Sequence, residues 1–349
     1  MKQVGILGLP QAGKTTLFEI LVQGAGGTAP GPGRRDTIGV VRVPDHRVDR
    51  LSDLYRPKKT THTQIQFVDA ATAAASGRAA SRVDSFTSVR NCDALAAVVR
   101  DFENPAVPIE GGVKPGRDLR NLEAELILAD LGLVETRLER IEKELRVGKK
   151  QGERERELLL RCRQALEAER PLRQERFTPA EETALRSFNF LTRKPLLVVY
   201  NQDDASRRAP PENGPGTLAV AMRAHLEREV IALQPAERAT FRAELDIQED
   251  GLSLVIRASY ELLGLISFFT VGPDEVKAWT LRRGQTALDA AAEIHTDLAR
   301  GFIRAEVVGW QELAEAGGTA QARGRGILRL EGRDYVVQDG DCLEIRFNR

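Results

Sequence analysis

Eight residues near the start of the chain, Gly8-Leu-Pro-Gln-Ala-Gly-Lys-Thr15, have the types and spacing that phosphate chemistry needs. The pattern G-x-x-x-x-G-K-[S/T] is typical of a P-loop, in which glycines let backbone N–H groups surround phosphate oxygens. An apolar run, Val4–Leu7, precedes it, and a helix-forming run, Thr16–Val22, follows it. The sequence therefore predicts a strand, a phosphate-binding loop and a helix whose N-terminus favours an anion.

The side chains of this loop have distinct predicted roles. Lys14 would contact the β- and γ-phosphates and is the candidate catalytic residue, and the Thr15 hydroxyl would bind Mg²⁺, the expected cofactor. The predicted phosphate-binding set is Pro10, Gln11, Ala12, Gly13, Lys14, Thr15 and Thr16.

A second predicted metal ligand ends a buried strand over 64–69. In P-loop proteins an Asp at such a place holds Mg²⁺ directly or through water, which makes Asp69 the partner of Thr15. The usual continuation is Asp-x-x-Gly, whereas this chain has Asp69-Ala-Ala-Thr72. The Cβ of Thr72 restricts the close approach that glycine allows, and no Gln or His follows to orient water. The run predicts metal binding more firmly than rapid hydrolysis.

The candidate base-binding residues follow another buried strand, over 195–200. The run Asn201-Gln-Asp-Asp204 resembles Asn-Lys-x-Asp, in which Asp accepts from guanine N1–H and the exocyclic amine while Asn braces the loop. Gln202 replaces the Lys whose stem would stack on the ring. The predicted set is Asn201, Gln202, Asp204 and Ala224. Asp204 favours guanine, but GTP and ATP both remain open.

Composition limits the classes of protein. The 349 residues are 42% apolar and 29% charged, and 51 basic residues balance 51 acidic ones. A core is therefore expected, whereas a basic field over the whole molecule, as for nucleic acid, is not. No apolar run approaches the length of a membrane span, the P-loop strand leaves no room for a signal peptide, and the three distant cysteines fit a reducing compartment. A cytoplasmic protein without a membrane partner is expected.

Further buried strands over 37–43, 93–99 and 218–221 alternate with helical runs, which predicts an α/β sheet. A glycine- and proline-rich stretch, 24–33, is either a switch that senses the γ-phosphate or a plain linker. From 119 to 146 apolar residues recur at steps of four and three, and Leu159, Cys162 and Leu166 repeat the spacing after a break over 148–152. This predicts an antiparallel helical hairpin. Its charges are those of a solvated face, with the tip, Lys149-Lys150, an alternative contact for a macromolecule.

The end of the chain predicts a smaller module. Strands are expected over 277–281, 302–308, 327–330, 335–337 and 342–347, with a helix over 287–299. Such a β-grasp-like α+β module usually binds partners.

Several stretches resemble the YchF subfamily of Obg-like P-loop GTPases, also called Obg-like ATPases. The shared runs are Gly8–Thr15, Gly39–Asp45, Phe67–Asp69, Ala124–Leu131, Tyr260–Phe269, Ile294–Asp297, Gly301–Val307 and Tyr335–Asp341. The resemblance implies an α/β P-loop NTPase domain of Ras-like, Obg type, with an inserted α-helical coiled-coil hairpin and a C-terminal β-grasp-like TGS domain. It places the nucleotide domain at 1–118 and 191–275, the hairpin at 119–190 and the TGS domain at 276–349.

The same resemblance implies slow, Mg²⁺-dependent hydrolysis of GTP or ATP by a ribosome-associated regulatory NTPase, with ribosome or RNA contacts through the TGS domain and hairpin. Three departures matter: Gly33 stands where the family has its switch Thr, Thr72 where it has Gly, and Asp204 where it usually has Glu. Two hypotheses remain open, a slow NTPase switch and a nucleotide-binding adaptor with little hydrolysis. A non-nucleotide scaffold would leave Lys14 without a role.

Overall fold

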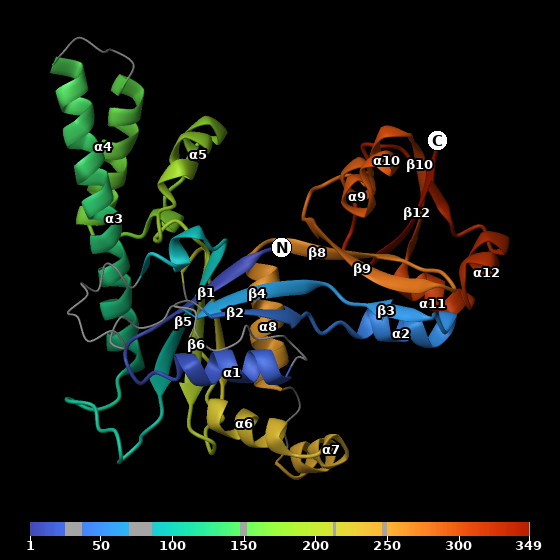
Figure 1. The fold of residues 1–349 in the computed structure, drawn as a ribbon, viewed down its shortest axis with the longest axis horizontal. Coiled ribbons are helices and arrows are strands. Elements are labelled where there is room, and N and C mark those ends of the chain that lie inside the picture. The colour runs from blue at the N-terminus through green and yellow to red at the C-terminus, as the bar shows by residue number, and fades with distance from the viewer. Residues whose placement is uncertain (25–36, 70–85, 147–151, 212–213, 246–249, 349) are drawn as a thin grey trace. The chain divides into compact units, whose positions relative to one another are not determined.

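The computed structural model describes residues 1–24, 37–69, 86–146, 152–211, 214–245 and 250–348 (Figure 1). The chain forms two compact units: residues 1–41 with 66–262, and residues 42–65 with 263–349. The predicted switch loop with Gly33, the residue Thr72 and the basic tip of the hairpin lie outside the described residues. Neither the switch nor the tip can therefore be placed in the structure.

The first unit is built on an α/β sheet, as predicted. In the described chain its strand order is β2-β4-β1-β5-β6-β7, with β1 Gln3–Leu7, β2 Thr37–Arg42, β4 Gln64–Asp69, β5 Ala94–Asp101, β6 Leu196–Gln202 and β7 Thr217–Met222. β1 pairs in parallel with β4 and β5, and β6 pairs in parallel with β5 and β7. Every residue of β5 and β6 is buried, as expected where helices cover both faces of a parallel sheet.

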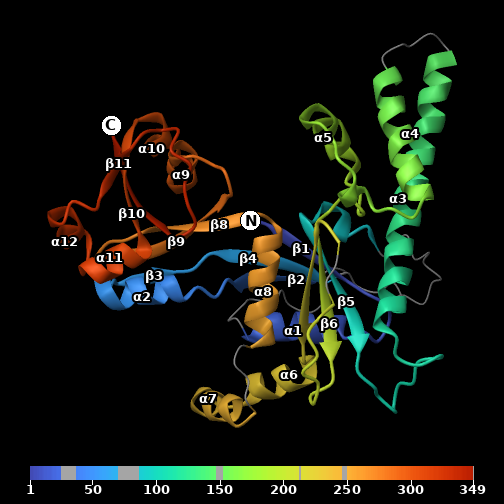
Figure 2. The same cartoon turned by 180° about the vertical axis from the view of Figure 1, so that it is seen from behind.

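Helices cover that sheet on both faces, as Figure 2 shows from behind. Among them α3 Pro115–Arg146 packs on β5, and α8 Gly251–Leu262 packs on β6 and β7. The other helices of this unit are α1 Lys14–Gly24, α4 Glu153–Glu167, α5 Pro179–Leu185, α6 Ala224–Ala232 and α7 Pro235–Glu244. Leu122 and Leu126 of α3 pack in one core cluster with Leu95, Ala97 and Val99 of β5. Short 3₁₀ turns lie at Val89–Asn91, Leu172–Gln174 and Arg186–Phe188.

The predicted helical hairpin is confirmed as α3 and α4. The apolar repeat forms its seam, because Val134, Leu138, Ile141, Leu159, Cys162 and Leu166 share one buried cluster. Arg137 clamps the two helices by donating to both carboxylate oxygens of Glu155, at 2.7 and 2.8 Å. α3 begins at Pro115, four residues before the predicted start, since proline suits the first turn of a helix.

The second unit contains a mixed sheet. Among its described residues the strand order is β11-β10-β12-β8-β9-β3, with β3 Lys59–Thr61, β8 Leu265–Thr270, β9 Glu275–Arg282, β10 Phe302–Gly309, β11 Arg329–Glu331 and β12 Asp341–Phe347. β10 is antiparallel to β11 and β12, and β8 is antiparallel to β9. Its helices are α2 His46–Tyr55, α9 Ala287–Ile294, α10 Thr296–Arg300, α11 Trp310–Ala316 and α12 Thr319–Gly324.

Residues 42–65 belong to this second unit rather than to a nucleotide domain covering 1–118. β3 pairs in parallel with β9, with Lys59 opposite Glu275. Val48 and Leu51 of α2 are fully buried in the same cluster as Phe269. β8 likewise lies in the second unit, which begins again at Leu263 instead of at residue 276.

Two local expectations about the C-terminal module were wrong, and one strand was missed. The helix expected over 287–299 is two helices, because His295 at φ −164 is extended and caps the second one. Residues 335–337 form no strand, and only an isolated bridge joins Val336 to Thr286. The strand β8 was not predicted. Its apolar residues Leu265–Phe269 are buried, so they lack the polar alternation of a half-exposed strand.

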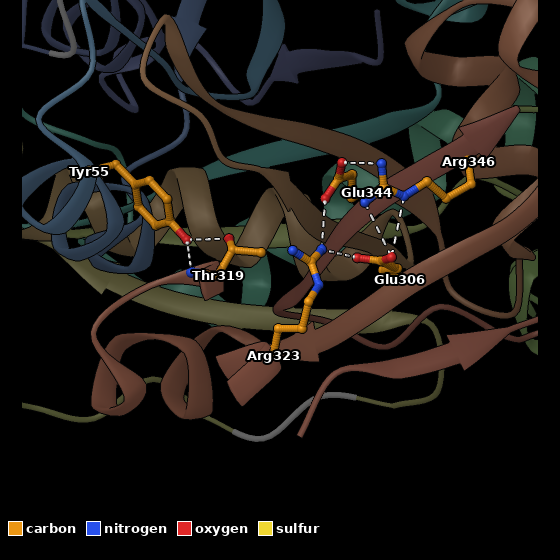
Figure 3. Close-up of polar contacts among 6 residues, drawn as sticks. All are labelled: Tyr55, Glu306, Thr319, Arg323, Glu344 and Arg346. Atoms are coloured by element: carbon orange, nitrogen blue, oxygen red, sulfur yellow. Dashed lines mark hydrogen bonds and ion pairs between the residues drawn. The ribbon is translucent and has the colours of Figure 1, made fainter. Parts of the chain in front are cut away.

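Polar contacts tie α12 to α2 and to the sheet of the second unit (Figure 3). The Thr319 N–H donates to the Tyr55 hydroxyl at 2.8 Å. Glu306 of β10 lies opposite Glu344 of β12, an arrangement of like charges that is unfavourable by itself. Arg323 and Arg346 both pair with both acids and neutralise them. In the described part of the chain, no helix combines the length and apolar character required to cross a membrane.

Candidate functional site

The turn from β1 to α1 has the backbone that a phosphate-binding loop requires. Gly8 has φ +154, and a Cβ there would lie 2.4 Å from the Val98 carbonyl oxygen. Gly13 has φ +99, and its Cβ would lie 2.4 Å from Asn201 Nδ2. Both positions therefore need glycine, the first for a close backbone approach and the second to admit the neighbouring amide. The loop delivers the N-terminus of α1, where unpaired N–H groups favour an anion.

The rest of the loop is partly exposed. Pro10 and Gln11 are exposed, and Gln11 is one of the few non-glycine residues with a positive φ, +64. That left-handed conformation costs about 1 kcal/mol or more for a residue with a Cβ. Ala12 is buried, whereas Thr15 in the first turn of α1 is exposed and available to a ligand.

Lys14 folds back over its own loop. Its Nζ donates to the carbonyl oxygens of Gly8 at 2.9 Å and Leu9 at 3.0 Å. Burial lowers the pKa of Lys14, and the nearby Asp69 carboxylate acts in the opposite direction. The ammonium group is thus held at the mouth of the loop by neutral acceptors. An anionic phosphate is a stronger partner for it than these carbonyls.

Asp69 ends β4 beside β1, in register with Ile6. Burial raises the pKa of Asp69, Lys14 opposes that shift, and Glu19 adds to it. A partly buried carboxylate next to one cation would gain from a second positive charge. Asp69 and Thr15 offer the hard oxygen donors that Mg²⁺ prefers, so the residues present fit that ion. Within the described residues no three His, Cys, Asp or Glu side chains gather as a separate metal site.

Asn201, at the end of β6, braces two parts of the site. Its Nδ2 donates to the Ala12 carbonyl at 3.1 Å, and its Oδ1 accepts from the Ala224 N–H at 3.1 Å. The side chain therefore fixes the phosphate loop to the start of α6. Ala224 is buried and its N–H is taken by Asn201, so the structure gives it a bracing position, and its predicted contact with a base stays a prediction.

Gln202 does not extend into solvent as a stacking lysine would. It is 5% exposed, and its Nε2 donates to Asp101 Oδ2 at 3.3 Å and to the Arg208 carbonyl at 3.1 Å. The amide is held against the end of β5, because its NH2 group donates to both acceptors. Any stacking on a base must therefore come from another residue.

Asp204 is held by the first turn of α6. Its Oδ2 lies 2.8 Å from His225 Nδ1, and its Oδ1 accepts from the Leu226 N–H at 3.2 Å. The predicted base-reading carboxylate is therefore already hydrogen-bonded at both oxygens. Nothing in the sequence pairs His225 with Asp204.

A pocket of about 340 Å³ joins these elements. It is lined by Gly13 and Thr16, by the loop Asn201–Asp204, by His225 and Arg228, and by Phe102–Pro105. The last segment directly follows β5. The Arg100 guanidinium lies over the Phe102 ring, 4.6 Å from its centroid. An aromatic residue directly after a central parallel strand was the available signal, since ligands bind at that edge of such sheets.

A parallel sheet, a glycine-dependent loop at a helix N-terminus, and a lysine beside an acid define the P-loop NTPase class. Comparisons with known proteins agree. The chain is 38% identical over 360 residues to "Ribosome-binding ATPase YchF" of Bacillus subtilis, covering 99% of this chain and 98% of that protein. It is 36% identical over 362 residues to the protein of the same name from Escherichia coli O157:H7, with the same coverage.

The structural comparison gives the same result. "Structure of the Schizosaccharomyces pombe YchF GTPase" matches with a TM-score of 0.84 at 29% identity, covering 99% of this chain and 97% of that one. Residues 265–348 match the family model YchF-GTPase_C, described as a "Protein of unknown function (DUF933)". The chain belongs to the YchF family, as its motifs predicted.

Proposed function

We propose that this chain binds a purine nucleoside triphosphate with Mg²⁺ and hydrolyses it slowly, as a ribosome-associated regulatory NTPase in the cytoplasm. The observation that carries the proposal is the phosphate loop itself. Lys14 is held by neutral carbonyls beside Asp69, and Asn201 connects that loop to the adjacent pocket. Phosphates would bind at Gly13–Thr16, and the base would occupy the pocket beside Phe102.

The residues supply binding and charge stabilisation more than proton transfer. Lys14 would leave the Gly8 and Leu9 carbonyls for the β- and γ-phosphate oxygens, where its charge opposes the negative charge of the transition state. Thr15 and Asp69 would hold Mg²⁺, which would supply charge neutralisation between the phosphates when bound. Phe102 would stack on the base in place of the missing lysine stem, since aromatic faces bind any purine. Modest base selectivity follows.

Single-turnover hydrolysis with radiolabelled ATP and GTP tests the reaction. Phosphate release above buffer that is lost in Lys14→Ala supports slow catalysis. Tight binding without release supports the second candidate, a nucleotide-binding adaptor. That candidate is favoured by the sequence Asp69-Ala-Ala-Thr72, which lacks the glycine and the water-orienting residue. Calorimetry that detects neither ATP nor GTP binding in the presence of Mg²⁺ would reject both.

The proposed macromolecular partner is the ribosome, contacted through the C-terminal unit and the tip of the helical hairpin. The names of the bacterial relatives support the partner, and the near-complete coverage supports its transfer to this chain. Cosedimentation of the full chain with ribosomes tests it. Lys149→Glu with Lys150→Glu should weaken cosedimentation if the tip takes part, whereas Arg163→Glu on the exposed side of α4 serves as the matched control.

A further inference from the structure

The Asp204 carboxylate bears on which base the proposed nucleotide pocket prefers. An inference from it therefore rests on the proposed function. Guanine offers N1–H and an exocyclic amine side by side, and a free carboxylate can accept from both. Adenine offers no such donor pair on that edge. The state of the Asp204 carboxylate therefore affects guanine and adenine nucleotides differently, because only guanine gains from a free carboxylate.

Asp204 is not free in this structure. His225 Nδ1 lies 2.8 Å from Oδ2, and the Leu226 N–H donates to Oδ1 at 3.2 Å. The His225 nitrogen must carry the proton in this contact, because a carboxylate can only accept. The ring takes one of the two acceptor sites of Oδ2 through a hydrogen bond to an ionised group, which is the stronger kind, so a guanine donor must use the remaining site beside the ring.

The backbone donor of Leu226 is fixed by the fold of α6, whereas the His225 ring is a replaceable side chain. The His225 side chain is 58% exposed. Glu229, one turn further along α6, lies 3.9 Å from Nε2 and helps to orient the ring. His225 and Leu226, the two residues that hydrogen-bond to Asp204, thus both lie in the first turn of α6. Removal of the ring would free Oδ2 without opening a cavity.

We propose that His225 sets the base preference of this pocket by occupying the Asp204 carboxylate, which weakens guanine binding relative to adenine binding. His225 is a selectivity residue and acts through Asp204. It does not contact the phosphates, and its effect should be confined to the base.

The test is calorimetric affinity of the full chain for GTP and for ATP, each with Mg²⁺, in the parent protein and in His225→Ala. The ratio of GTP affinity to ATP affinity should rise about tenfold or more in His225→Ala, which is the effect of one hydrogen bond to a charged group. ATP affinity should change by less than about twofold. His295→Ala, an exposed histidine in the other unit, should leave the ratio unchanged.

Asp204→Asn in the His225→Ala background should abolish the gain, because Asn replaces one acceptor oxygen with an NH2 group, which is a donor and meets a guanine donor unfavourably. A ratio of GTP affinity to ATP affinity that stays constant or falls in His225→Ala would overturn the inference. A fall would mean that the ring orients Asp204 toward guanine. A parent protein that binds neither nucleotide would instead reject the proposed function. The two failures are therefore distinguishable.

Discussion

The two units use charge in opposite ways. In the first, parallel strands bring their carboxyl ends to one edge of the sheet, so Asp69 of β4 and Asn201 of β6 lie around the phosphate loop. In the second, strands run in both directions and charges pair with one another, as Glu306 does with Arg323 and Arg346. Side chains at the first edge are arranged for a ligand, whereas those of the second sheet stabilise the fold.

The largest expected effect tests whether the sheet edge of the first unit is arranged for a ligand. Lys14→Ala should lower affinity for ATP and GTP with Mg²⁺ by about 100-fold or more, because the loop loses its one ammonium donor to the phosphates. Its only hydrogen-bond partners among the described residues are two carbonyls of its own loop, so the free energy of unfolding should change little. Calorimetric binding and urea denaturation measure the two quantities. An unchanged affinity of Lys14→Ala for both nucleotides would contradict the proposed phosphate-binding site.

A substitution in α2 tests whether paired charges stabilise the second unit. Arg47 donates to Asp45 at 2.8 Å and to Asp339 at 2.9 Å, and it lies over the Phe269 ring. Arg47→Ala should lower the free energy of unfolding of its unit by about 2–3 kcal/mol, because two acids lose a largely buried partner. Nucleotide affinity should stay within about twofold of the parent.

Lys58→Ala is the matched control for Arg47. Its ion pair with Asp274 joins side chains that are 82% and 80% exposed. Such a pair contributes about 0–1 kcal/mol, so the denaturation midpoint should barely move. Equal effects of the two substitutions would show that the charges of the second unit do not stabilise it as described.

The pH dependence of ATP affinity separates the contribution of the Lys14 charge from that of the loop geometry. The protonated amine binds phosphate, so affinity is present below the pKa of Lys14 in the free protein and falls as pH rises through it. Burial lowers that pKa, so the loss should begin below the ordinary lysine value of about 10.4. ATP affinity measured from pH 8 upward should decline by up to about tenfold per pH unit above that pKa. Constant affinity up to the ordinary value would contradict the shift.

The smallest effect concerns backbone strain at Gln11, with φ +64. Gln11→Gly should raise the free energy of unfolding of the first unit by up to about 1 kcal/mol, because glycine adopts that conformation without a Cβ penalty, although added freedom in the unfolded chain offsets part of the gain. Gln11→Ala keeps the Cβ and is the control, with no gain expected. Thermal or urea denaturation measures both. A loss of stability in Gln11→Gly would show that the side chain stabilises the loop.

Local patterns were enough to predict much of the fold. The glycine spacing at Gly8 and Gly13, the buried strands and the apolar repeat of the hairpin depend on residues close together in the sequence, where sterics and periodicity act directly. The break at His295 was missed because the helical spacing of Ala291, Ile294 and Leu298 continues across it. The absence of a strand at 335–337 was missed because pairing depends on a partner strand, which propensity does not supply.

The sequence predicted individual residues of the candidate site, but it did not predict which residues contact one another. The motifs identified Lys14, Asp69, Asn201 and Asp204. They did not show that Phe102 lines the pocket, that Gln202 turns toward Asp101, or that His225 holds Asp204. Each of these contacts joins segments about 20 to 100 residues apart, so the distances depend on how the strands and α6 are packed.

The sequence by itself determined that a phosphate loop follows the first strand, because only glycine permits those backbone angles and only a lysine at that spacing reaches the phosphates. It also determined the hairpin and, by resemblance, the family. The tertiary structure decided that residues 42–65 join the C-terminal unit and that Asp204 is occupied by His225. Such pairings depend on contacts between distant segments, whose free energy is gained only when the whole sheet or helix face has assembled.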